Sequence, residues 1–174
     1  MSGESSNFSE GSVDLFKIMM LAGSVIGIAS VFFVWFSEEY LIVQFNYTGY
    51  DFFMKTHGYP EEGYFIYMPL IVLIASAVSV AVSALAFTKH LRKAAVAGIA
   101  LGAVVLISAG LYIFYPLSKI WFSSDGIDVF VPVKLMDYLG GGVFSAVLAG
   151  IFLCAGGIAI LLLARGGIGA QKDG

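Results

Sequence analysis

The sequence has few charged residues and few side chains able to bind metals or form disulfides. Only 12% of its 174 residues are charged, whereas 59% are hydrophobic, and the mean hydropathy is +0.92. Soluble domains contain about a quarter charged residues, so this composition excludes an ordinary soluble fold. With one cysteine, Cys154, the chain cannot form an internal disulfide.

Motifs for catalysis and for nucleotide binding are also missing. The sequence has no glycine-rich phosphate loop after a strand, no nucleophile elbow and no basic nucleic-acid patch. His57, Glu61 and Glu62 lie close together, and we interpret them as an acidic helix start rather than a metal site. We therefore expect no enzyme, no catalytic residue, no cofactor, no metal and no nucleic-acid partner.

Long uncharged runs dominate the sequence instead. A hydrocarbon core about 30 Å thick requires about 20 apolar helical residues. Four runs of suitable length contain no Asp, Glu, Lys, Arg or His: 18–36, 64–87, 94–115 and 139–164. They predict an all-α integral membrane protein, a bundle of four transmembrane helices in a single domain over residues 1–174.

The first run differs from a cleaved signal peptide. The polar tail before it, residues 1–15, is acidic rather than basic, and the run is longer than the apolar part of such signals. We expect an uncleaved anchor. The tail, rich in Ser and Gly, is expected to be flexible.

The positions of lysine and arginine predict the orientation. Lys89, Arg92 and Lys93 fall in the short turn 88–93, and short loops count most under the positive-inside rule. If both tails (1–15 and 165–174) are cytoplasmic, six of the nine Lys and Arg residues lie inside and three lie in the outer loops, 37–63 and 116–138. We expect this orientation in the cell membrane.

Both outer loops have the alternation of a strand. Residues 41–53 combine alternating side chains with turn residues at 46–49, and the second loop has Asp125-Gly126 between two alternating segments. We predict two hairpins that together form a small extracytoplasmic β-sheet over the bundle. Alternatively, the loop aromatics lie flat on the membrane as interfacial anchors. The predicted outer-loop contact residues are Trp35, Tyr47, Trp121 and Phe130.

A glycosylation sequon lies in the first outer loop. Asn46-Tyr47-Thr48 has the required pattern, which makes Asn46 a possible glycan acceptor on the outer side. Asn7-Phe8-Ser9 matches as well, but it belongs to the inner tail, so we expect Asn7 to be unmodified.

Small residues recur at every fourth position in the spans and predict close helix packing. Most are expected inside the bundle, although some could face a partner. The predicted packing residues are Gly23, Gly27, Ala75, Ser79, Ser83, Gly98, Gly102, Gly142, Ala146 and Gly150.

No ionisable residue and no mid-span proline interrupts the four runs. Transporters and pumps usually place such residues inside the membrane, so active transport is disfavoured. Ser76, Ser79 and Ser108 could line a pathway, but serines in helices more often bond to their own backbone.

The chain has four spans, a short basic inner turn and two outer loops of β character. In this layout nearly the whole chain resembles the claudin and peripheral-myelin type of tetraspan protein. The family's Trp, Gly-Leu-Trp and cysteine-pair motif is not part of this resemblance. The likeness implies a sheet that caps the bundle and contacts made through the outer loops.

Three hypotheses for the function follow. The first is a non-catalytic membrane protein that binds other membrane proteins or itself, as an accessory subunit or a self-assembling tetraspan surrounded by lipid. The second is a pore or transporter for small solutes or lipids that uses the serine-lined bundle. The third, a membrane enzyme with exterior acids such as Glu61 and Asp125, has the least support.

Overall fold

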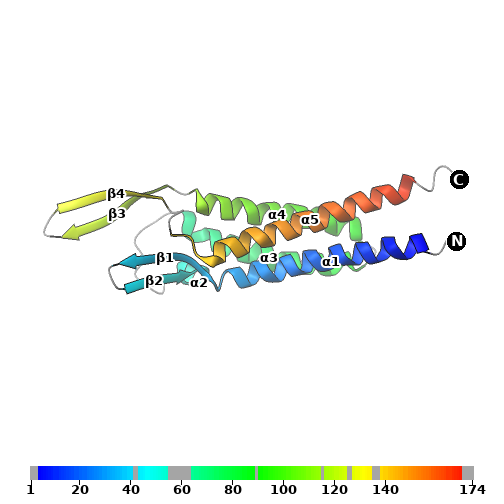
Figure 1. The fold of residues 1–174 in the computed structure, drawn as a ribbon, viewed down its shortest axis with the longest axis horizontal. Helices are drawn as coiled ribbons and strands as arrows, with labels where there is room; N and C mark the ends of the chain where they lie inside the picture. Colours follow the sequence, from blue (N-terminus) through cyan, green and yellow to red (C-terminus); the bar gives the residue numbers. More distant parts are fainter. Residues whose placement is uncertain are drawn as a thin grey trace.

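Four long helices form the body of the protein. The computed structural model describes residues 4–40, 43–54, 64–88, 90–114, 116–124, 127–134 and 138–169. Successive long helices run in opposite directions (Figure 1). Helices α1 and α4 each pack against α3 and α5. The helices are α1 (Glu4–Ser30), α3 (Met68–Ala86), α4 (Leu91–Ile113) and α5 (Gly141–Gly169).

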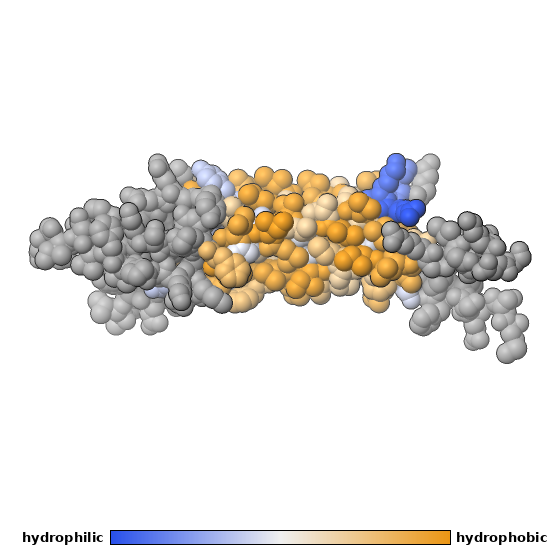
Figure 2. All heavy atoms as spheres, turned by 90° about the horizontal axis from the view of Figure 1, so that it is seen from above, coloured by the Kyte–Doolittle hydropathy of each residue, from blue (hydrophilic) through white to orange (hydrophobic). Residues whose placement is uncertain are grey.

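The outer surface of the bundle is apolar. Figure 2 shows a belt of hydrophobic side chains over the helices, with hydrophilic side chains where the belt ends. Large residues such as Ile74, Ile107 and Phe144 are exposed on this surface. The four expected apolar helices are thus present, and each is long and apolar enough to cross a membrane. Exposed apolar surface of this extent is characteristic of contact with lipid.

Helix α1 differs from the prediction at both ends. Residues 4–15, expected to be a flexible tail, continue the helix. A helix that is already nucleated gains one backbone hydrogen bond for each residue added, and Lys17 forms an i,i+3 ion pair with Asp14 at 2.7 Å. At the other end the helix stops at Ser30 and not at residue 36, because residues from Val34 onward form a strand.

Each outer loop contains a two-stranded antiparallel hairpin. Strand β1 (Val34–Tyr40) pairs with β2 (Val43–Thr48), and β3 (Pro116–Ser124) pairs with β4 (Ile127–Lys134). Both hairpins lie at the end of the bundle opposite the termini (Figure 1). Within the described ranges they form two separate sheets, so the single combined sheet was a wrong prediction. Each loop completes its own ladder locally.

The turn of the first hairpin was also misplaced. The strands meet between Tyr40 and Val43, whereas the predicted turn residues 46–49 end β2 and begin helix α2 (Gly49–Met54). The Thr48 Oγ1 accepts from the backbone N–H of Asp51 at 3.2 Å, and Asp51 Oδ2 accepts from the N–H of Thr48 at 2.9 Å. This reciprocal capping box explains the helix start. In the second hairpin, Ser124 pairs with Ile127 across the predicted turn position.

The remaining elements are short or close to their predicted bounds. A 3₁₀ turn, η1 (Tyr64–Tyr67), leads directly into α3. Helix α4 begins at Leu91, three residues before the predicted span, and α5 continues to Gly169.

Candidate functional site

A cluster of buried serines joins α1 to α3 in the middle of the bundle. The hydroxyl of Ser79 donates to Ser24 Oγ at 2.7 Å, and Ser24 Oγ lies 3.3 Å from Ser83 Oγ. All three residues have 0% exposure. Hydrogen bonds of this kind hold helices together where lipid offers no hydrophobic drive for association.

The fourth serine of the cluster, Ser76, has a different role. Its hydroxyl oxygen is buried without a hydrogen-bond partner in the described part of the chain. It faces Gly27 of α1, where an added Cβ would collide with the Ser76 side chain. The Ser76 hydroxyl therefore lies directly against the backbone of α1 at Gly27.

These contacts describe a closed interface rather than a polar path. The Ser24 hydroxyl donates to Met20 O at 2.9 Å, and Ser108 donates to Val104 O at 2.8 Å. Such bonds satisfy serine through its own helix. In the described segments the buried polar residues are all serines, and none is ionisable.

Replacing Ser79 with alanine is expected to lower the free energy of unfolding by about 0.5–1.5 kcal/mol, because the bond to Ser24 is lost. Ser76→Ala is expected to be neutral or slightly stabilising, because it removes a buried hydroxyl without a partner. Unfolding by SDS titration in mild detergent, followed by circular dichroism, measures both. The control is Ser145→Ala on α5, since the Ser145 hydroxyl bonds only to Gly141 O of its own helix. A larger loss for Ser76→Ala than for Ser79→Ala would contradict the assignment.

The glycines predicted for packing lie where helix backbones approach each other. A Cβ on Gly102 of α4 would stand 2.9 Å from the Gly150 carbonyl of α5, and one on Gly150 would stand 3.0 Å from the Gly102 carbonyl. A Cβ on Gly23 of α1 would stand 2.9 Å from the Ala149 carbonyl of α5. The other predicted packing residues, Ala75, Gly98, Gly142 and Ala146, are buried as well.

Two further close contacts were not predicted. A Cβ on Gly156 would stand 2.9 Å from the Phe16 carbonyl of α1, and one on Gly157 would stand 2.7 Å from the Ala95 carbonyl of α4. The adjacent glycines Gly156 and Gly157 of α5 therefore allow close approach of two different helices, α1 and α4. The Gly-Gly pair in the sequence of this helix could have indicated these contacts.

Aromatic side chains close the bundle at the hairpin end. Trp35 is fully buried, and its ring meets the Tyr112 ring edge to face with centroids 5.0 Å apart. Phe52 of α2 also packs on Tyr112, and Phe36 stacks on Tyr138. These contacts connect the first outer loop to α4 and to the segment before α5.

Trp35 therefore lies inside the protein and not at the outer interface, where it was predicted as a contact residue. Its indole Nε1–H donates to the Ser30 carbonyl at 2.7 Å. That carbonyl belongs to the last turn of α1, where backbone acceptors lack i→i+4 partners, and it also accepts from the backbone N–H of Phe33 at 3.2 Å. The indole caps the helix and fixes the direction in which β1 departs.

The other predicted outer-loop residues have different positions. Tyr47 is half-buried and packs against Phe36 and Phe52. Trp121 and Phe130 lie directly opposite each other in the β3–β4 ladder. Asn46 is exposed on β2, where its Oδ1 accepts a hydrogen bond from the Ser37 hydroxyl at 2.8 Å.

A metal site has no basis in the described residues, where no group of three potential ligands occurs. His57, Glu61, Glu62 and Asp125 lie outside the described ranges. No protein-family model, no curated protein and no solved structure matches this chain significantly.

Proposed function

We propose that this chain is a non-catalytic integral membrane protein that binds other proteins, as an accessory subunit of a membrane complex or as a self-assembling tetraspan. In this proposal the four long helices cross the cell membrane. The basic turn around Arg92 and both termini face the cytoplasm, and the two hairpins face outward. The bundle end that holds this turn also holds the termini (Figure 1), as the positive-inside rule requires for this orientation.

The observation that carries the proposal is the open β3–β4 hairpin. Its strands contain nine and eight residues and project past the helices (Figure 1). Within the described ranges each strand pairs only with the other, so each keeps one open edge. An isolated hairpin is marginally stable, and an open edge is a template for an added strand. A protein partner supplies such a strand or a covering surface.

The interior of the bundle also favours binding over transport. The serines that a pore would need at its wall are fully buried and bonded to each other across α1 and α3. Opening a path there would break these bonds and separate Gly27 from Ser76. The pore alternative is for this reason the weaker one.

Shortening the β3–β4 hairpin tests the proposal. Residues 118–132 are replaced with a short Gly/Ser linker, and the full chain is purified in mild detergent from its own host cells. The wild type is expected to migrate as a complex by native mass measurement, and the shortened variant as a single chain with unchanged helical circular dichroism. A matched variant keeps the hairpin and changes Phe114, a residue of the exposed bundle surface, to Leu; it should assemble normally. A strictly monomeric wild type, or assembly that survives the shortening, would contradict the proposal.

A further inference from the structure

The surface of the bundle is hollowed where α3 turns into α4. One part of this groove has a volume of about 630 Å³. An adjoining part has a volume of about 340 Å³. The two parts share three lining residues, His90, Lys93 and Ala97. The groove is therefore one continuous hollow on the surface of α4. Its smaller part also reaches Val82 and Leu85 of α3.

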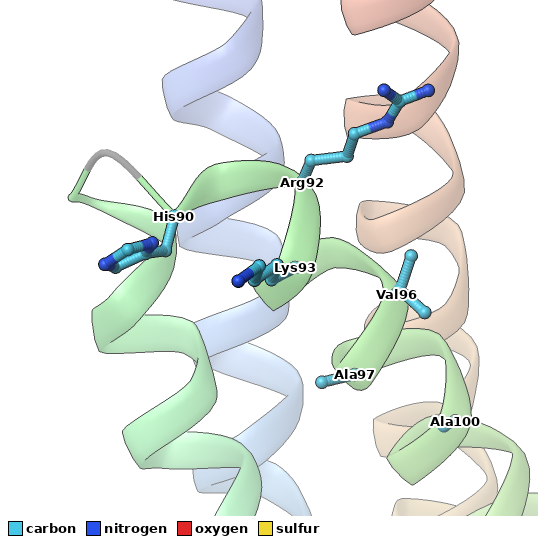
Figure 3. A pocket seen from close by; sticks show the side chains of 6 residues that line it. All are labelled: His90, Arg92, Lys93, Val96, Ala97 and Ala100. Atoms are coloured by element: carbon cyan, nitrogen blue, oxygen red, sulfur yellow. The ribbon is translucent and has the colours of Figure 1, made fainter.

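The groove is basic at one end and apolar at the other. Arg92 and Lys93 stand in the first turn of α4, while Val96, Ala97 and Ala100 line the wall further along the helix (Figure 3). In Figure 3 the His90 and Lys93 side chains point to one side of α4 and Arg92 to the other. All three line the same hollow, which therefore lies between them over the first turn of the helix. Ala100 lies seven positions after Lys93, which at 1.5 Å per residue is about 10 Å along the helix axis.

The charge at the basic end is not neutralised by the described residues. Lys17, at the same end of the bundle, has an acidic partner in Asp14. Arg92 and Lys93 have no acidic partner among the side chains that the structure describes, and both are exposed. They also occupy the N-terminal turn of a helix, where the macrodipole is positive and disfavours cations. His90 at the N-cap provides no side-chain hydrogen bond to that turn. An anion bound here would relieve both effects.

We propose that this groove binds one anionic phospholipid, with the phosphate at Arg92 and Lys93 and an acyl chain along Val96, Ala97 and Ala100. The arrangement matches the ligand in charge and in polarity, because the basic end lies beside the inner turn and the apolar wall belongs to the membrane-crossing part of α4. Basic hollows between helices on the cytoplasmic side are a known means of holding anionic head groups. A soluble phosphate would leave the apolar wall uncovered, whereas a phospholipid covers it.

Lipid binding by the purified full chain tests this proposal. The protein in nonionic detergent is mixed with dioleoyl phosphatidylglycerol, and bound lipid is counted by native mass spectrometry. We expect one lipid molecule for each chain, with at least tenfold weaker binding of dioleoyl phosphatidylcholine, which has the same chains and no net charge. Glycerol 3-phosphate, which has the phosphate but no acyl chain, should not displace the lipid.

Matched variants separate the charge from the groove. The double variant R92Q/K93Q is expected to weaken phosphatidylglycerol binding about 20- to 30-fold, since each basic residue near an anionic surface contributes about fivefold. Lys17→Gln removes one positive charge at the same end of the bundle, but Asp14 already pairs with this lysine, so binding should change less than twofold. Ala97→Leu fills the groove and should weaken binding at least fivefold, whereas Ala77→Leu, on the exposed surface of α3, should not.

Three results would overturn the proposal. Equal binding of the two lipids, or equal losses for Lys17→Gln and R92Q/K93Q, would show a general lipid coat instead of a site. Displacement by glycerol 3-phosphate would show a site for a soluble anion. Circular dichroism of each variant identifies a misfolded protein, and Lys93→Arg, which keeps the charge, should then still bind. None of these measurements requires the protein partner.

Discussion

Replacing Trp35 with alanine is expected to destabilise the protein by about 3–5 kcal/mol, the usual cost of removing a large buried aromatic side chain. The indole has 0% exposure and packs edge to face on Tyr112. Its loss also leaves the Ser30 carbonyl without its 2.7 Å hydrogen bond. Because Trp35 belongs to β1 and bonds to the last turn of α1, the first hairpin should also lose its fixed position relative to the bundle. SDS titration in mild detergent, followed by circular dichroism, measures the loss.

Two variants divide the effect of Trp35 into its parts. Trp35→Phe keeps most of the ring and removes the N–H group, so it should cost about 1–3 kcal/mol. Phe33→Ala is the control, since Phe33 precedes Trp35 by two positions and is 52% exposed, and it should cost about 0.5 kcal/mol. If Trp35→Ala unfolded at the same SDS concentration as the wild type, the indole would lie at the membrane interface and not in the core.

Replacing Gly102 with alanine is expected to cost about 2–3 kcal/mol through overpacking. A Cβ at this position would stand 2.7 Å from Cys154 Sγ, 2.8 Å from Leu153 Cβ and 2.9 Å from the Gly150 carbonyl. The carbonyl and the Cβ belong to the α5 backbone or are attached to it directly, so α4 and α5 must separate to make room. Thermal unfolding in mild detergent measures the change.

Gly110 is the matched control on the same helix. An added Cβ there would have no atom within 4 Å. Gly110→Ala should therefore be neutral or stabilising by about 1 kcal/mol, which is the helix propensity gained by replacing glycine. Similar losses for the two variants would show that Gly102 matters for its backbone flexibility and not for close packing with α5.

The four helices could be predicted from the sequence because each contains a long run without charge. A charge in the hydrocarbon core is costly, so runs without charge reveal the helices regardless of how these pack. The small residues at every fourth position could also be interpreted without knowing the fold. A residue such as Gly102 or Gly150 lets two helix backbones approach closely, so it predicts a helix contact.

The position of Trp35 could not be predicted because it depends on a contact between residues far apart in the sequence. A tryptophan at the end of an apolar run fits a membrane interface as well as a core, and only the position of Tyr112 distinguishes the two. Thr48 and Asp51 have the spacing of a capping box, yet the turn residues around them also fit a hairpin. The groove beside Arg92 and Lys93 could not be predicted. In the sequence these two residues indicate only which side of the membrane the turn faces. A hollow depends on how the side chains of α3 and α4 pack.

We propose that the helices cross the membrane with both hairpins on one side and the basic turn on the other. Single cysteines placed at Ser37, Ser123 and Thr88 in a Cys154→Ala background test it most directly, using a membrane-impermeant maleimide on intact cells. We predict labelling at Ser37 and Ser123 in intact cells, and labelling at Thr88 only after the membrane is permeabilised. Labelling of Thr88 in intact cells, or protection of either hairpin position until permeabilisation, would contradict the claim.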